Sequence, residues 1–323
     1  MAYAVAEDEV EPVVRGLLGL IDVDGGPTTE QLDVLWSITS HLWRRPDLAS
    51  ARLSPLSPDE LAVTLGDERA RRRFHVIAVT LELCRHPLSQ AQVNSAEAYA
   101  HALGVEGADL LIMRDWIDSG VERAMQDWKR CFGSMAENLS EASLRSSEEL
   151  SEEELWDQEG SDAAMLERLL EFRELPSGSL GREYLAFYER NAITLPGVAQ
   201  RGRLQTVAIS HDMHHVIAGY EPTGQGEIAL GAFQMALSDS EDHLVQFLGN
   251  LLIHEAGVLD PGGFVPKSAS LLRPGAFEML GEAFERGAKC RADFTTIDHF
   301  AIAGWDLSEV REEYGVVPVT LNA

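Results

Sequence analysis

The stretch that decides the fold is His211-Asp212-Met213-His214-His215, followed by Glu227 twelve residues after His215. Successive residues of an α-helix turn by about 100°, so His215 lies about 40° from His211 and Asp212 about 100° from it. These three side chains therefore share one side of a helix. Two imidazoles one turn apart are able to point at the same ion, as in other zinc sites carried by helices.

The residues after this stretch predict a second helix that returns over the first. Gly219 predicts the end of the histidine helix, and residues 220–224 predict a turn. A new apolar-periodic run begins at Glu227 and continues to residue 237. An antiparallel return brings the Glu227 carboxylate back over His211 and His215. His214, at about 300°, falls off this side, and we expect it to support the site or to lie on the surface.

Two histidines, one aspartate and one glutamate form a mixed nitrogen and oxygen ligand set. Such a set suits a divalent metal, Zn²⁺ first, with Fe²⁺ or Mn²⁺ as alternatives. The sequence thus predicts His211, Asp212, His215 and Glu227 as metal ligands, with Asp212 serving either as a ligand or as a catalytic group that orients an imidazole. The competing interpretation is a chance group of packed or surface histidines.

The motif and its flanks resemble the Coq-four family of ubiquinone biosynthesis proteins over about residues 160–318. The likeness rests on His211-Asp212-x-x-His215 with Glu227, on Leu175 to Tyr184 (LPSGSLGREY) and on Gly304 to Val316 (GWDLSEVREEYGV). The resemblance implies action on the head group of a polyprenyl hydroxybenzoate, with C1 decarboxylation coupled to hydroxylation. It also implies a prenylated aromatic or quinone precursor as ligand and other quinone-biosynthesis proteins as partners.

Two other functions fit the same residues. One is a lipid-binding scaffold of a quinone-biosynthesis complex, in which the metal is structural and fully coordinated. The other is a metal-dependent hydrolase. Arg286 and Lys289 lie where the family has basic residues that could meet a carboxylate or diphosphate, although cations are also favoured at any helix C-terminus.

Composition narrows the class of protein. The chain has 323 residues, is 45% hydrophobic and carries a net charge of −27, which argues against binding nucleic acid or an anionic membrane by charge. Its three cysteines form no CxxC pair, its first residues are acidic rather than basic, and no apolar run reaches the length of a membrane span. We expect a homo-oligomer in a reducing cytoplasm, with at most peripheral contact at the inner face of the membrane.

Apolar periodicity and breakers predict an all-α fold of two helical domains. Residues 1–136 resemble a TerB-like (tellurite resistance) helical bundle, 137–162 form an acidic linker, and 163–323 form the Coq-four-like metal-binding domain. The expected helices span residues 12–20, 28–43, from 57, 74–84, 89–101, 107–113, 163–170, 181–191, 201–218, 227–237, 243–256 and 274–288. The apolar residues in 233–247 and 271–284 either fill the core or line a groove for an isoprenoid tail.

Four further motifs carry less weight. Gly224-x-Gly226-x-x-Ala229 fits a dinucleotide fingerprint, but no strand precedes it and Glu227 stands where a phosphate would bind. His254-Glu255 lacks the second histidine of a metalloprotease helix, so we expect His254 in the core or a pocket. The basic segment 69–73 predicts a solvated helix start or a salt-bridge face, and Asp22 and Asp24 belong to a turn rather than a calcium loop.

Overall fold

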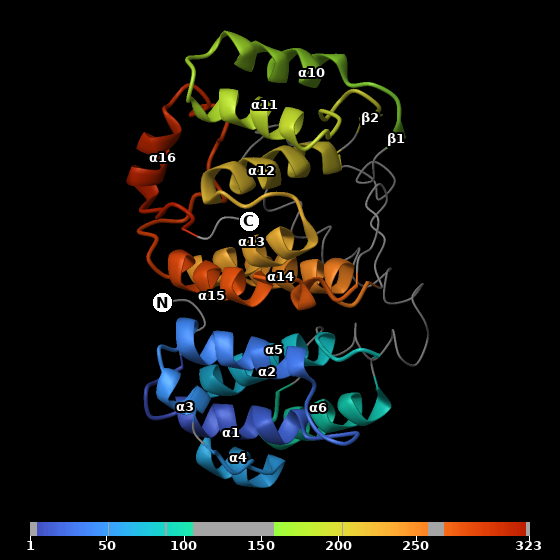
Figure 1. The fold of residues 1–323 in the computed structure, drawn as a ribbon, viewed down its shortest axis with the longest axis vertical. Coiled ribbons are helices and arrows are strands. Elements are labelled where there is room, and N and C mark those ends of the chain that lie inside the picture. The colour runs from blue at the N-terminus through green and yellow to red at the C-terminus, as the bar shows by residue number, and fades with distance from the viewer. Residues whose placement is uncertain are drawn as a thin grey trace. The chain divides into compact units, whose positions relative to one another are not determined.

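The computed structural model describes residues 5–50, 52–87, 89–105, 158–201, 203–257 and 268–320 (Figure 1). Within these ranges the fold is all-α, which confirms the predicted class. Extended pairing among them is limited to a short antiparallel pair, β1 (Gln158–Glu159) with β2 (Gln200–Arg201), and an isolated antiparallel bridge between Ser179 and Asp306. None of the helices in this part of the chain is long and apolar enough to cross a membrane.

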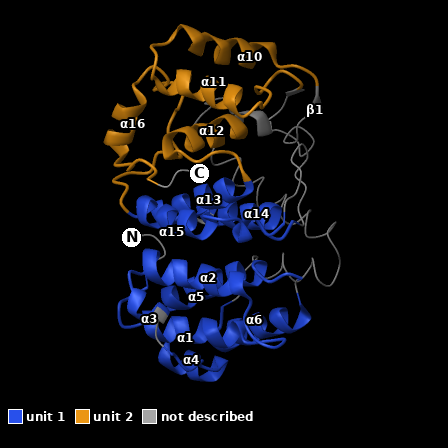
Figure 2. Ribbon diagram, viewed as in Figure 1, with its two compact units in different colours: residues 1–129, 224–288 blue, residues 130–223, 289–323 orange. Residues whose placement is uncertain are grey.

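Two compact units divide the chain, and each is discontinuous in sequence (Figure 2). The first comprises residues 1–129 and 224–288, and the second residues 130–223 and 289–323. This grouping differs from the consecutive order expected from the sequence, because residues 224–288 pack with the N-terminal helices. The predicted helix 107–113 and most of the acidic segment 137–162 lie outside the described residues. The TerB-like module and the linker therefore stay predictions.

The N-terminal helices of the first unit begin where the sequence places capping residues. Thr28 and Ser57 each form a reciprocal capping box, with Gln31 and Glu60, and Ser89 caps its helix by accepting from a backbone N–H. The helices are α1 (Val10–Ile21), α2 (Thr29–Ser37), α3 (Pro46–Ser50), α4 (Pro58–Thr64), α5 (Glu68–Leu83) and α6 (Gln90–Leu103), with a π-helical turn, η1 (Ile38–Leu42), continuing α2. Gly104 ends α6 in the left-handed conformation that favours glycine.

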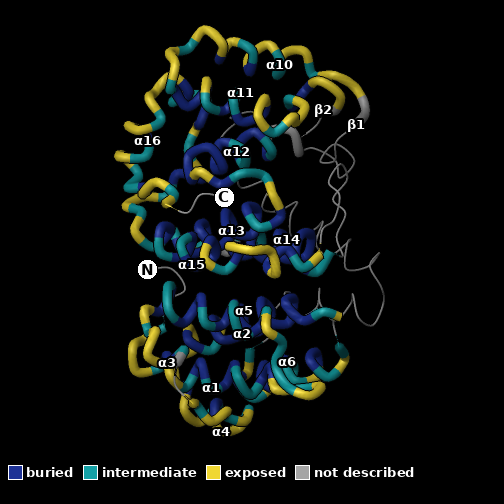
Figure 3. The backbone as a smooth tube through the Cα atoms, in the orientation of Figure 1, coloured by how far each residue is buried: buried dark blue, intermediate teal, exposed yellow. Residues whose placement is uncertain are grey.

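The remaining helices of the first unit are α13 (Gly224–Leu237), α14 (Glu241–His254) and α15 (Ala276–Gly287), with the short turn η3 (Ser270–Leu272) before α15. α13 packs against both α14 and α15 and is buried along nearly its whole length (Figure 3). Phe233, Phe247 and Phe284 are fully buried among these helices. These apolar side chains therefore fill the core of the unit, which was the simpler of the two expectations for them.

Polar contacts join α13–α15 to the N-terminal helices. Arg69 and Arg73 of α5 both form ion pairs with the carboxylate of Asp239, which lies between α13 and α14. The basic segment 69–73 therefore forms a salt-bridge face on the first turns of α5. His41 in η1 contacts Glu285 of α15, with 2.7 Å between the imidazole Nδ1 and the carboxylate oxygen. Since α15 also packs on α2 and η1, and α14 on α5, the N-terminal helices and α13–α15 share one core.

The second unit is built from α10 (Ala163–Leu170), the short turn η2 (Glu171–Glu174), α11 (Leu180–Arg190), α12 (Arg203–Ala218) and α16 (Leu307–Tyr314). α11 packs along α12, and α16 contacts both. Arg311 of α16 donates to the backbone carbonyls of Val216 and Ile217, at 2.9 Å each. This guanidinium satisfies acceptors that the last turn of α12 would otherwise leave without intrahelical partners.

Candidate metal centre

α12 brings His211 and His215 together as the i, i+4 spacing predicts. Their Nε2 atoms lie 3.1 Å apart, and the two rings are nearly perpendicular, with centroids 4.7 Å apart. His215 is buried, whereas His211 is partly exposed. The pair thus has one imidazole fixed in the interior and one that solvent reaches.

The turn after α12 fixes the tautomer of His215. Gly219 adopts a φ of 85°, a left-handed conformation that suits glycine, and it lets the Tyr220 carbonyl fold back toward the helix. That carbonyl oxygen lies 2.9 Å from His215 Nδ1. Because a carbonyl only accepts, the ring proton must be on Nδ1, and the Nε2 lone pair points at His211. A backbone carbonyl that orients an imidazole in this way is typical of metal-binding histidines.

α11 supplies a wall of aromatic rings against this pair. The Phe187 ring stacks on His215 at a centroid distance of 5.6 Å and an interplanar angle of 26°. The Arg190 guanidinium lies 5.1 Å from the centroid of the same phenylalanine. Since Phe187 is fully buried, it holds the plane of the His215 ring.

Asp212 turns toward α11. Its carboxylate accepts a hydrogen bond from the Tyr188 hydroxyl, and the Tyr184 ring lies 4.9 Å behind that of Tyr188. Burial, and next the Asp212 charge, raise the pKa values of both tyrosines far above the usual range, so both phenols keep their protons. The sequence predicted Asp212 as a ligand or as an orienting group, and the structure adds Tyr188 as its partner.

His214 lies on the other side of α12, as its helical angle predicts. It is buried, and its ring centroid lies 5.0 Å from that of His299 and 5.8 Å from that of Phe294. Burial lowers the pKa of His299 to about 4, so this imidazole is neutral at physiological pH. His214 therefore belongs to the interior of the second unit.

Glu227 belongs to the first unit and lies in the first turn of α13. The helix begins at Gly224, three residues before the start that the sequence predicted, so Glu227 is already helical. Glu227 is 6% exposed, and its backbone carbonyl accepts a hydrogen bond from Asn250 Nδ2 at 2.6 Å. The first turn of a helix stabilises a carboxylate, which keeps Glu227 suited to binding a cation.

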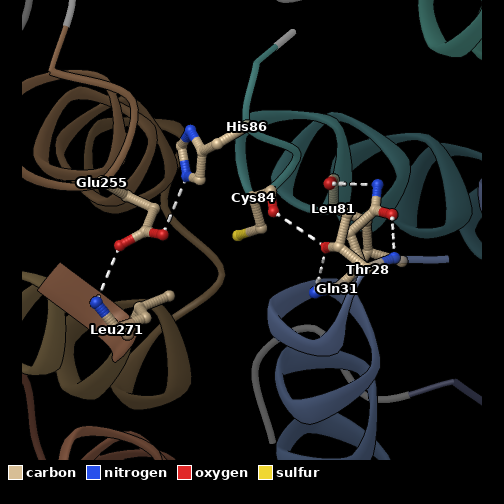
Figure 4. A network of polar contacts seen from close by, with 7 residues as sticks. All are labelled: Thr28, Gln31, Leu81, Cys84, His86, Glu255 and Leu271. Carbon is tan, nitrogen blue, oxygen red and sulfur yellow. Dashed lines mark hydrogen bonds and ion pairs between the residues drawn. The ribbon is translucent and has the colours of Figure 1, made fainter. Parts of the chain in front are cut away.

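The His254-Glu255 pair has a structural setting. Glu255 is fully buried and accepts from the Leu271 backbone N–H at 2.8 Å and from His86 Nε2 at 2.9 Å (Figure 4). Next to it, burial and the Glu255 charge raise the pKa of the Cys84 thiol, so this cysteine is not a nucleophile. His254 is buried in the last turn of α14, as expected for a core or pocket residue.

The two basic residues near the end of α15 differ in exposure. Arg286 is 2% exposed, and its guanidinium lies 5.3 Å from the centroid of the Phe233 ring, in the packing between α13 and α15. Lys289 is exposed. Within the first unit Arg286 therefore acts as a packed cation at a helix C-terminus, which was one of its two expected roles.

Sequence reasoning missed the residues that support the histidines. Tyr184, Phe187 and Tyr188 follow an i, i+3, i+4 pattern, which marks one face of an amphipathic helix but does not say which helix that face contacts. His299 carried no local signal, since it lies in an irregular segment. Only the aromatic spacing could have drawn attention to α11.

Comparison with known proteins gives little beyond this geometry. No family model matches the sequence, and no curated protein matches it. Among solved structures, the chain is similar to a protein of Nostoc punctiforme PCC 73102 that is provisionally named a ubiquinone biosynthesis protein. The two share 17% sequence identity with a TM-score of 0.34, over 75% of this chain and 96% of the other.

Proposed function

We propose that the chain is a metal-dependent enzyme in which His211, His215 and Glu227 hold one divalent cation, Zn²⁺ in the first instance. Each of the three offers one ligand atom, an imidazole nitrogen or a carboxylate oxygen. Two nitrogens and one oxygen form a ligand set found in catalytic zinc sites, which keep a further position for water or substrate.

The observation that carries the proposal is the placement of the two ring nitrogens of His215, from which its tautomer is inferred. Its Nδ1 proton is committed to the Tyr220 carbonyl, and its Nε2 lone pair faces His211 Nε2 at 3.1 Å. Two imidazole nitrogens presented at the same point are prepared for a cation before it arrives. Phe187 and Tyr220 fix the ring at little entropic cost on binding, which is the usual benefit of a supported ligand.

Glu227 completes the proposed set from the next helix along the chain. It follows His215 by twelve residues, and the intervening segment holds the turn that begins at Gly219. Its carboxylate is buried at a helix start, where the first N–H groups favour negative charge.

The substrate class follows from the resemblance noted in the sequence. We propose a polyprenyl hydroxybenzoate or a related prenylated aromatic acid, whose C1 carboxylate leaves as CO₂. A proton takes its place at C1, or, where an external two-electron oxidant such as dioxygen takes part, a hydroxyl does. A bound divalent cation supplies a Lewis acid that stabilises negative charge on the head group. The chain orients the imidazoles through Phe187 and Tyr220, and it keeps the Asp212 carboxylate beside them as the group that accepts or returns a proton.

Native mass spectrometry of the protein purified from its host tests this proposal, because it reports bound metal and any co-purifying prenyl lipid together. We expect one equivalent of metal in the unmodified protein and none in His215→Ala. His101→Ala, which changes an exposed histidine of α6, is the matched control and should keep the metal. Retention of one equivalent by His215→Ala would show that the ligand assignment is wrong.

Turnover separates the enzyme from the scaffold. With a prenylated hydroxybenzoate as substrate, we expect CO₂ release by the unmodified protein and none by Glu227→Gln, which should still fold. A protein that binds both metal and lipid without releasing CO₂ would contradict the enzymatic proposal and favour the scaffold. Turnover of an ester or phosphoester panel instead would favour the hydrolase.

A further inference from the structure

We propose that Glu221 is a positioning residue whose carboxylate ties the turn after α12 to the end of α11 and so holds the His215 ring in the orientation that binds the metal. The inference rests on the proposed function, and it adds a residue that lies outside the metal motif. Glu221 acts through two groups that contact His215 directly, the Tyr220 carbonyl and the Phe187 ring.

The Glu221 carboxylate is held at both of its oxygens by the end of α11. Arg190 Nε donates to Oε1 at 2.9 Å, and Arg190 Nη2 lies 2.9 Å from the same oxygen. Asn191 Nδ2 donates to Oε2 at 2.6 Å. Arg190 is the last residue of α11 and Asn191 is its C-cap, so two consecutive residues fix the carboxylate. Hydrogen bonds at both oxygens, one set of them charge-assisted, leave the carboxylate little freedom to turn.

The peptide group between Tyr220 and Glu221 carries the carbonyl that accepts from His215 Nδ1. Because a peptide group is planar, the direction of that carbonyl depends on the positions of both residues. On one side, the Tyr220 backbone N–H donates to the His215 carbonyl at 3.2 Å, which ties Tyr220 to α12. On the other side, the carboxylate ties Glu221 to α11. Releasing Glu221 therefore removes one of the two anchors that aim the carbonyl at the imidazole.

The residues that hold Glu221 also contact the ring that stacks on His215. The Arg190 guanidinium lies 5.1 Å from the centroid of the Phe187 ring. Asn191 Nδ2, besides its bond to Glu221, donates to the Phe187 carbonyl at 3.0 Å. One carboxylate thus links the support at the edge of the imidazole to the support on its face.

The expected signature is a loss of metal affinity with little loss of stability. The side chains of Arg190 and Glu221 are 45% and 36% exposed, and exposed ion pairs contribute little to the stability of a fold. In contrast, removing a group that orients a metal-binding imidazole typically weakens metal binding by about 10- to 100-fold. Glu221 acts through a peptide group and an aromatic ring, so we expect a loss at the lower end of that range.

Titration of the metal-free protein with Zn²⁺ against a competing chelator tests this expectation. We expect Glu221→Ala to weaken Zn²⁺ binding about tenfold, with a melting temperature close to that of the unmodified protein. Glu221→Gln keeps one acceptor oxygen and should weaken binding by less. Glu189→Ala removes an exposed carboxylate from the same helix, so it controls for net charge and should keep the affinity within about twofold.

The tautomer of His215 gives a second readout that a purely structural role would not change. It is read from the ¹⁵N shifts of the ring nitrogens of the metal-free protein in mildly alkaline buffer. We expect the proton on Nδ1 in the unmodified protein and in Glu189→Ala. Glu221→Ala should show a mixture of the two tautomers, because the Tyr220 carbonyl no longer holds the proton on Nδ1.

Either an unchanged tautomer or an unchanged affinity for Zn²⁺ in Glu221→Ala would overturn the inference. An equal loss of affinity in Glu189→Ala would also overturn it, since the effect would then come from net charge. If the unmodified protein binds no Zn²⁺, the proposed function fails. The tautomer comparison needs no metal, so it still decides whether Glu221 positions the His215 ring.

Discussion

Replacing His215 with alanine removes two interactions and opens a cavity, none of which applies to His211→Ala. The hydrogen bond from His215 Nδ1 to the Tyr220 carbonyl is lost, the Phe187 ring loses its stacking on His215, and a buried space opens between α11 and α12. A lost hydrogen bond to a buried carbonyl costs about 1–2 kcal/mol, and a partly collapsed cavity of this size costs about 1–2 kcal/mol more. We therefore expect His215→Ala to lower the free energy of unfolding of the metal-free protein by about 3 kcal/mol. His211 is partly exposed, so its alanine variant should lose less than about 1 kcal/mol.

Urea unfolding with a chelator and with saturating Zn²⁺ separates these losses from metal binding. The unmodified protein should gain about 2.7 kcal/mol when free Zn²⁺ is a hundredfold above its Kd, and neither variant should gain anything. The reasoning is refuted if His211→Ala and His215→Ala destabilise the metal-free protein equally. It is also refuted if either variant keeps the zinc-dependent gain.

Two other predictions concern the first unit. Burial raises the pKa of Glu82 to about 8, and neither of its oxygens has a hydrogen-bond partner among the described residues. The folded state then holds a proton that the unfolded state releases above its own pKa of about 4.3, so stability falls as pH rises toward 8. Denaturant unfolding between pH 6.5 and 8 should show a loss of about 1–2 kcal/mol that Glu82→Gln abolishes; an equal loss in that variant would assign the effect to other groups. Gly287→Ala places a Cβ 2.1 Å from the Phe233 carbonyl oxygen and should lower the free energy of unfolding by at least about 2 kcal/mol. Gly281→Ala meets the partly exposed His41 ring, which is able to move, so it should lower the free energy of unfolding by less. Equal shifts in Tm for the two variants would contradict this ranking.

Helix positions were predictable where the determining residues are local. Thr28, Ser57 and Ser89 cap their helices with their own side chains, and Gly104 and Gly219 end the helices that precede them. The pairing of His211 with His215 depends only on helical periodicity, so it too could be read from spacing. Local chemistry of this kind needs no knowledge of the tertiary fold.

Contacts between distant segments were not predictable in the same way. The aromatic face of α11 was visible as a pattern, but nothing in the pattern says that Phe187 meets His215 or that Tyr188 meets Asp212. The packing of α15 on η1 likewise depends on Gly281, which lets the His41 ring approach the helix closely. Such pairings follow from the shape of whole helix faces, which a single sequence does not encode in short motifs.

The start of α13 is an intermediate case. Glu227 looked like the first residue of its helix because the apolar run begins there, yet Gly224 and Gly226 are already helical. Because glycine has a low helix propensity, the sequence predicted that the turn after α12 would extend through residues 220–224. Gly224 is needed for another reason, since a Cβ there would lie 2.3 Å from Ser270 Oγ. Tertiary packing has overridden local propensity at this helix start.

X-ray absorption spectroscopy at the zinc edge of the metal-loaded protein tests the central claim most directly, because it reads the ligand shell of the ion. Two histidines and one glutamate predict a first shell of nitrogen and oxygen at about 2.0–2.2 Å, with the outer-shell scattering of two imidazoles. Glu227→Gln should change the oxygen contribution and leave both imidazoles in place. A spectrum without imidazole scattering, or one that Glu227→Gln leaves unchanged, would contradict the account.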